Sequence, residues 1–178
     1  MQTFGTLTLQ PALERPDLLG ETVRQALAAW GHAGGVGVAE IDPDLAETAA
    51  MTEAYDVPLE SSANCVVVMG RRGGEERTAA CVVRADTRAD VNNAVRRTLD
   101  VRKCSFLDHD RAVAETGMEY GGITPIGIPT RWRLLIDEAV GAIDNAIVGS
   151  GIRGSKLFVP GRLLCLLPSA ELITGLAL

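Results

Sequence analysis

The part of this sequence best suited to chemistry is a glycine-rich loop, Gly121–Gly127, which runs Gly-Gly-Ile-Thr-Pro-Ile-Gly. Glycines this close together let a ligand approach the backbone, because no Cβ stands in the way. Their N–H groups can converge on one anionic or carbonyl oxygen. Glycine and proline are also the usual residues of turns. The loop alone therefore fits a structural connector equally well.

Other motifs that would carry chemistry are missing from the sequence. No Gly-Lys-Ser/Thr follows the loop, which excludes a P-loop, and its glycine spacing is not that of a dinucleotide-binding turn. The four cysteines form no Cys-x-x-Cys pair, and His32 and His109 are far from them in sequence. We therefore expect free thiols in a reducing compartment, with no metal and no cofactor.

The elements that must position the loop follow from hydrophobic periodicity and turn residues. Apolar residues at helical spacing predict helices over about 17–30, 44–55 and 90–99, with a short one starting at Asp108 or Asp110 and ending at Gly117. Apolar, β-branched runs predict strands over about 34–39, 64–69, 77–83, 103–106, 133–136, 145–148, 156–159 and 171–176. Strands outnumber helices and alternate with them irregularly. This favours an α+β fold, a mixed sheet with flanking helices.

Length, composition and charge indicate a globular protein. The 178 residues suit one domain, and 47% of them are hydrophobic. No apolar run is long enough to cross a bilayer, and residues 1–10 lack the pattern of a signal peptide, so we expect a cytoplasmic protein with no membrane partner. The net charge is −6, but residues 71–103 hold nine basic and five acidic side chains. On charge alone, this basic segment is an ordinary solvated surface.

The loop also carries a family resemblance. Gly121-x-x-x-Pro125-x-Gly127 resembles the Gly-x-x-x-Pro-x-Gly loop of the YbaK/prolyl-tRNA-synthetase-associated family. Further segments resemble that family in order and spacing: Ala85–Val91, Lys103–Phe106, Glu115–Gly117, Ile136–Glu138, Val148–Gly151 and Ser155–Leu157. The resemblance covers about 44–176. It predicts an editing domain over 44–178, with 1–43 as an N-terminal helix and strand extension packed on it.

Members of that family hydrolyse the ester bond of mischarged tRNA. The resemblance therefore implies a single-domain, partly barrel-like mixed sheet with flanking helices. It also implies a trans-acting deacylase that serves translation fidelity, with the 3′ end of aminoacyl-tRNA as its partner and an aminoacyl-tRNA synthetase as a second candidate partner. No metal is required by this chemistry.

Site residues follow from the resemblance and from the loop. The expected catalytic residues are Asn64, Gly121 and Gly122. The expected substrate-binding residues are Thr124, Pro125, Gly127, Asp137, Gly149, Ser150 and Gly151. For Asp137 an alternative is equally open, because an aspartate after a strand often caps the next helix.

The sequence departs from the family pattern at one important position. The family carries a lysine at the start of the strand that here begins at Asn64, while Lys103 and Lys156 are the only lysines of this chain and belong to other segments. Asparagine is neutral but can donate and accept hydrogen bonds. Two alternatives follow. Either Asn64 positions the substrate and the loop still catalyses hydrolysis, which we favour, or the domain binds an aminoacyl group, a related metabolite or a synthetase partner without hydrolysis.

Overall fold

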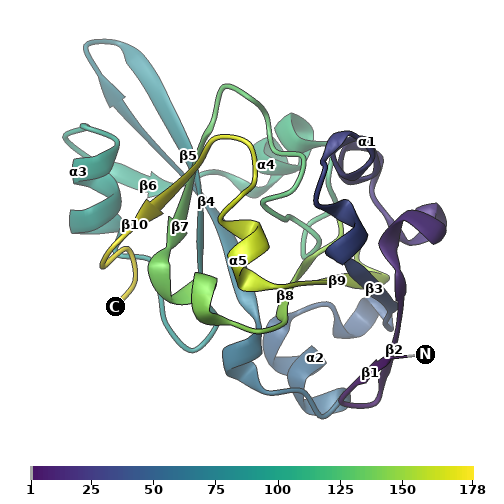
Figure 1. Cartoon of the computed structure of the whole chain (residues 1–178). Coiled ribbons are helices and arrows are strands. Elements are labelled where there is room, and N and C mark those ends of the chain that lie inside the picture. Colours follow the sequence, from purple (N-terminus) through teal and green to yellow (C-terminus); the bar gives the residue numbers. More distant parts are fainter. Residues whose placement is uncertain (1) are drawn as a thin grey trace.

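The computed structural model describes residues 2–178, in which ten strands form two five-stranded sheets (Figure 1). The first sheet is antiparallel and has the order β1 (Gln2–Phe4), β2 (Leu7–Pro11), β3 (Gly37–Glu40), β9 (Ser155–Val159), β8 (Ala146–Gly149). The second is mixed and has the order β10 (Ala170–Ile173), β7 (Arg133–Asp137), β5 (Glu75–Arg84), β4 (Ala63–Arg72), β6 (Cys104–Phe106). Within residues 2–178 neither sheet closes on itself.

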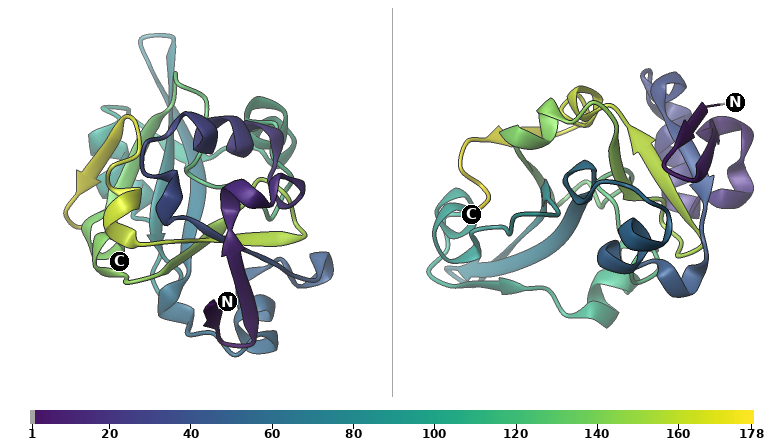
Figure 2. Two further views of the ribbon diagram at one scale, coloured as in Figure 1. Left: turned by 45° about the vertical axis from the view of Figure 1, so that its right-hand side comes forward. Right: turned by 90° about the horizontal axis from the view of Figure 1, so that it is seen from below.

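The helices are short and flank the sheets, as Figure 2 shows in two further views. The α-helices are α1 (Glu21–Ala29), α2 (Thr48–Ala54), α3 (Arg96–Thr98), α4 (His109–Thr116) and α5 (Gly161–Leu164). Single turns of 3-10 helix are η1 (Ala12–Glu14), η2 (Pro16–Leu18), η3 (Ala33–Gly35), η4 (Pro43–Leu45), η5 (Leu59–Ser61) and the longer η7 (Glu138–Ala142), and η6 (Val91–Val95) is a π-helix. The predicted α+β single domain with flanking helices is confirmed, and its strands are divided between two sheets.

Several local predictions are confirmed by the caps. Asp90 accepts hydrogen bonds from the N–H groups of Asn93 and Ala94, Asp108 accepts from that of Arg111, and Gly117 ends α4 with φ +67°. The prediction that this helix begins at Asp17 was wrong, because Leu19 is extended and α1 begins only after Gly20. The hairpin β1–β2 was missed, since its inward residues, Leu7 and Leu9, are too few to give a strand pattern.

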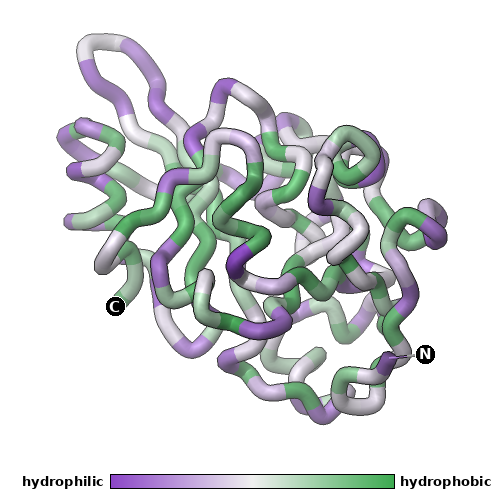
Figure 3. The backbone as a smooth tube through the Cα atoms, viewed as in Figure 1, coloured by the Kyte–Doolittle hydropathy of each residue, from purple (hydrophilic) through white to green (hydrophobic). Residues whose placement is uncertain are grey.

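The main core lies between the two sheets. Val23 and Leu27 of α1 pack there with side chains of β5, β7, β8 and β9. A second cluster of buried apolar side chains packs α2 against the first sheet. A third such cluster packs η6 against the second sheet. Because β5 is covered on both faces, its side chains from Thr78 to Val83 are all buried, and this accounts for its continuous apolar character (Figure 3).

The two sheets meet at the start of β4. Ser62, just before that strand, forms a parallel bridge with Ile147 of β8. Side chains from both sheets and from the segment before α2 gather at this junction, which places a pocket there. A search of residues 2–178 finds no helix with the length and apolar character needed to span a bilayer.

Candidate functional site

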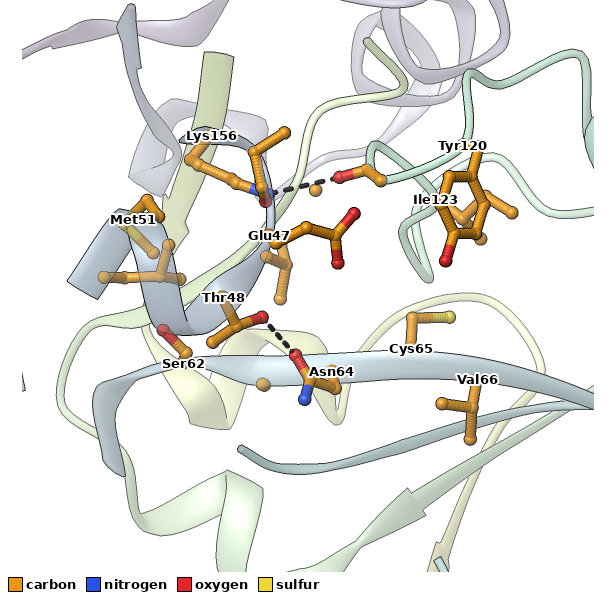
Figure 4. A pocket seen from close by; sticks show the side chains of 16 residues that line it. Glu47, Thr48, Met51, Ser62, Asn64, Cys65, Val66, Tyr120, Ile123 and Lys156 are labelled. Atoms are coloured by element: carbon orange, nitrogen blue, oxygen red, sulfur yellow. Dashed lines mark hydrogen bonds between the residues drawn. The ribbon is translucent and has the colours of Figure 1, made fainter. Parts of the chain in front are cut away.

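A polar pocket of about 260 Å³ opens at the junction of the two sheets (Figure 4). Its walls come from five separate segments of the chain. They are Ala46–Thr48 with Met51 of α2, Ser62–Val66 at the start of β4, Tyr120, Gly121 and Ile123 of the glycine-rich loop, Ile147–Gly149 of β8, and Lys156 of β9. Its volume lies below the roughly 300 Å³ at which pockets for drug-sized ligands begin. The pocket therefore suits a small group such as an amino acid.

A buried lysine provides the positive charge of this pocket. Lys156 is 6% exposed, and its Nζ donates hydrogen bonds to the carbonyl oxygens of Ala46 at 2.7 Å and Gly121 at 3.2 Å. Burial lowers the pKa of Lys156 from its usual 10.5 to about 8, while Glu47 opposes and Arg153 reinforces that shift. An ammonium group has three donors. One donor of Lys156 therefore remains for a ligand.

Asn64 lies on the pocket wall in a fixed orientation, with its NH₂ group turned away from Lys156 (Figure 4). Its Oδ1 accepts a hydrogen bond of 2.8 Å from Oγ1 of Thr48, the first residue of α2. That bond holds the side-chain oxygen toward α2, as Figure 4 shows. The NH₂ group of Asn64 then remains available as a donor.

The glycine-rich loop presents backbone donors to the same pocket. Gly122 does not contribute its N–H, because that group donates to the carbonyl of Glu119 at 2.9 Å. The N–H groups of Gly121 and Ile123 have no protein acceptor within residues 2–178, and both residues line the pocket. Gly121 adopts φ +83°, a conformation that favours glycine. The loop thus brings two residues with unpaired N–H groups to the wall of the pocket, and one of them, Gly121, contacts Lys156 through its carbonyl oxygen.

Gly122 and Gly149 explain how the loop reaches the pocket. Gly149 lies on the pocket wall, whereas Gly122 lies behind it and accepts a hydrogen bond from the N–H of Gly151 at 2.8 Å. A Cβ on Gly149 would lie 2.3 Å from the Gly122 carbonyl oxygen, and a Cβ on Gly122 would lie 2.7 Å from the backbone of Ile152. These glycines allow two backbone segments to touch.

The rest of the predicted loop site points elsewhere. Pro125 and Gly127 line a second, mainly apolar cavity of about 230 Å³ beside Trp30 and Trp132. Thr124 is fully buried, and its Oγ1 has no hydrogen-bond partner among the residues that the structure describes. The structure therefore separates these three residues from the polar pocket.

Of the other predicted substrate-binding residues, Gly149 lies on the pocket wall, whereas Ser150, Gly151 and Asp137 lie outside that pocket. Ser150 is fully buried and hydrogen-bonds to Ser155 Oγ at 2.7 Å. Gly151 packs against Gly20, which a Cβ there would meet at 3.0 Å. Asp137 caps η7 by accepting from the N–H of Ala139, and its other oxygen accepts from the N–H of Ala177. Its geometry matches the capping alternative.

A thiol also lines the pocket. Burial raises the pKa of Cys65 to about 12, so the group stays a neutral thiol at neutral pH and is a poor nucleophile. Among residues 2–178, no three His, Cys, Asp or Glu side chains gather closely enough to hold a metal ion.

Sequence reasoning missed Lys156 as a pocket residue. The signal was present, because a lysine stands inside a short apolar strand, Ser155–Val159, and lysines are almost never fully buried unless paired. Thr48, which holds Asn64, and Glu47, at the pocket rim, were missed as well. They come from the turn before α2 and from its first residue, where the sequence shows no distinctive pattern.

Comparison with known proteins identifies the family of this chain. The family model described as "Aminoacyl-tRNA editing domain" matches residues 42–165. Proline–tRNA ligase of Listeria monocytogenes serotype 4a (strain HCC23) is 29% identical over 113 residues, which are 63% of this chain and 19% of that protein. The ligase of Listeria innocua serovar 6a (strain ATCC BAA-680 / CLIP 11262) is 28% identical over 105 residues, 58% of this chain and 17% of that protein. The chain thus matches less than a fifth of the length of these relatives.

Two solved structures share the fold. A candidate trans-editing enzyme for prolyl tRNA synthetase superposes with a TM-score of 0.73 at 18% identity, covering 87% of this chain and 94% of that one. A hypothetical protein superposes with a TM-score of 0.77 at 16% identity, covering 89% of this chain and all of that one. The family model spans well over half of the sequence, and the chain therefore belongs to the aminoacyl-tRNA editing domain family.

Proposed function

We propose that this protein is a deacylase that removes the amino acid from mischarged tRNA in trans, in the cytoplasm, and so serves translation fidelity. The observation that carries the proposal is one small pocket lined by the buried Lys156, which donates to the carbonyl of Gly121, and by Gly121 and Ile123, whose N–H groups have no protein acceptor within residues 2–178. We further propose that 44–178 form the editing unit and that 1–43 support it, because β3 pairs with β9, the strand that carries Lys156.

The proposed chemistry is hydrolysis of an ester. Water, or a hydroxyl or thiol of the substrate itself, attacks the ester carbonyl and converts its oxygen into an oxyanion. The N–H groups of Gly121 and Ile123 and the remaining donor of Lys156 stabilise that charge. The bond to the ribose oxygen then breaks, and this oxygen takes up a proton. When water attacks, the products are a free amino acid and a tRNA with a free terminal hydroxyl; when the substrate's own hydroxyl or thiol attacks, the amino acid leaves as a cyclic ester or thioester and the tRNA product is the same.

Lys156 can also supply the positive charge that the missing family lysine would provide. The alternative of a binding module without hydrolysis rested on the neutral residue at Asn64. Lys156 reaches the same pocket from β9, so a positive charge is present in spite of that change. We therefore propose that the position of the charge has moved from β4 to β9 and that Asn64 holds the ribose or the ester carbonyl with its NH₂ group.

A deacylation assay tests this proposal. The purified protein is incubated with a panel of mischarged tRNAs, and the release of each amino acid is compared with the rate in buffer alone. We expect enzymatic release from at least one of them. Absence of turnover together with binding of a non-hydrolysable aminoacyl-adenosine analogue would instead support the binding module. Neither turnover nor binding would point to a protein that docks on a synthetase.

Asn64 gives a second prediction. Asn64→Ala is expected to lower kcat/KM by about 10-fold, since a hydrogen bond in a pocket contributes roughly 1–2 kcal/mol. Asn64→Lys is expected to give no increase over wild type, because Lys156 already supplies the charge. Asn145→Ala, which changes an asparagine outside the pocket lining, is the control. Unchanged kinetics of Asn64→Ala would remove Asn64 from the site, and a large gain for Asn64→Lys would show that Lys156 does not replace the family lysine.

A further inference from the structure

The unpaired cations of this acidic protein are concentrated in one stretch of the chain. Of the 17 lysines and arginines, ten have an Asp or Glu carboxylate within 4.0 Å in the part of the chain that the structure describes. Five of the other seven lie before, within and just after η6 and α3. These five, here called the basic face, are Arg88, Arg96, Arg97, Arg102 and Lys103.

Carboxylates of the same stretch do little to neutralise the basic face. Asp90 is buried and caps η6, and Asp100 pairs with Arg72 and Arg77 of the β4–β5 hairpin. The chain as a whole carries −6, so most of its remaining surface repels a polyanion. A phosphate backbone that binds this protein is therefore directed to the basic face.

An exposed aromatic side chain lies next to the basic face. Phe106 on β6 is 64% exposed and, with Arg88 and Asn92, walls a groove of about 480 Å³. Asn64 and Val66 of β4 belong both to this groove and to the polar pocket. The groove thus adjoins the pocket and lies where η6 and β6 contact each other.

We propose that the basic face and Phe106 form the docking surface for the single-stranded 3′ end of tRNA. Phosphates of the last nucleotides bind to the basic face, one unpaired base stacks on Phe106, and the terminal aminoacyl ester reaches the polar pocket past Asn64. Single-stranded nucleic acid is typically bound in this way, by cations along the backbone and aromatic rings under the bases. The proposal rests on the proposed editing function and adds to it the surface on which the substrate lies.

The test measures binding of an uncharged hairpin RNA of acceptor-stem length with a single-stranded 3′ end, by fluorescence anisotropy over a range of salt. The variant Arg88→Gln/Arg97→Gln/Lys103→Gln is expected to bind at least 10-fold more weakly. The slope of log K against log salt should fall by about 2, since each lost phosphate contact on a single strand removes roughly 0.7. Phe106→Ala should weaken binding about 5-fold or more, and only when the RNA has its 3′ overhang.

A matched control removes the same charge elsewhere. Arg24→Gln/Arg131→Gln/Arg162→Gln changes three exposed arginines of α1, the loop before β7 and α5, and should leave binding within about twofold of wild type. Equal weakening by both triple variants, or no binding of the RNA by wild type at low salt, would overturn the proposal. Thermal melting checks that all variants fold.

Deacylation separates this inference from the proposed function. If the wild type binds the RNA through the basic face but deacylates no tRNA, the editing proposal fails and the docking surface stands. If it deacylates tRNA and both triple variants keep the wild-type KM, the docking surface fails and the editing proposal stands. The expected result is a raised KM for the basic-face variant with its kcat retained.

Discussion

Lys156→Met is expected to lower kcat/KM for deacylation by at least about 100-fold, the effect typical of removing one donor from an oxyanion site. Lys156 reaches the pocket with two of its donors on the carbonyl oxygens of Ala46 and Gly121. Methionine has a similar length and no charge. The rate of amino-acid release, measured against the uncatalysed rate, gives the result.

Stability distinguishes a catalytic loss from a structural one. Replacing a buried charge by an apolar side chain is often neutral or stabilising, so Lys156→Met should melt at the same temperature as wild type or higher. Arg24→Met, which changes an exposed ion pair with Glu21 on α1, should alter neither rate nor melting temperature. A Lys156→Met protein that loses activity only because it unfolds would contradict a role for Lys156 in the chemistry.

The pKa of Lys156 gives this prediction a pH signature. The folded-state pKa is about 8 and the usual value is 10.5, so between these values the unfolded chain binds more protons. Stability relative to Lys156→Met should therefore rise as pH increases from 8 to 10.5, by up to about 3 kcal/mol. Over the same range kcat/KM should fall, because the ammonium loses its proton. Activity that stays constant through this window would exclude the charged form of Lys156 from the mechanism.

Much of the fold could be predicted because its signals are local. The hairpin β4–β5, the caps at Asp90 and Asp108 and the glycine end of α4 depend on residues that are close in sequence. The pocket depends on contacts between distant segments. Lys156 meets Ala46, which is 110 residues away, only because β9 pairs with β3 and β8. Periodicity within one strand does not reveal such a contact.

Glycine was ambiguous for a related reason. The same residue type opens a backbone to a ligand and lets two backbones touch. At Gly121 the free N–H and the pocket wall fit the first use, and at Gly149 and Gly122 the close carbonyl contact fits the second. Sequence shows the glycine but not what approaches it. The role of Asp137 was open in the same way, because a helix-capping aspartate and a ligand-binding carboxylate can both follow a strand.

Gly149→Ala is expected to reduce the free energy of unfolding by about 2–3 kcal/mol, the upper range for overpacking. The added Cβ would lie 2.3 Å from the carbonyl oxygen of Gly122 and 2.7 Å from that of Ile123. Both are backbone atoms, so relief requires the loop to move away from β8. In a protein of this size the melting temperature should fall by roughly 4–12 °C, as followed by circular dichroism or urea unfolding.

Gly34→Ala is the matched control, because a Cβ at Gly34 meets nothing within 4 Å. It should leave stability unchanged or slightly raised, since alanine restricts the unfolded chain more than glycine does. Equal melting temperatures for the two variants would show that the loop tolerates displacement from β8. Below its melting temperature, Gly149→Ala should still deacylate more slowly than Gly34→Ala. The N–H groups of Gly121 and Ile123 belong to the displaced loop and would no longer lie beside Lys156, so stability and catalysis depend on the same backbone contact.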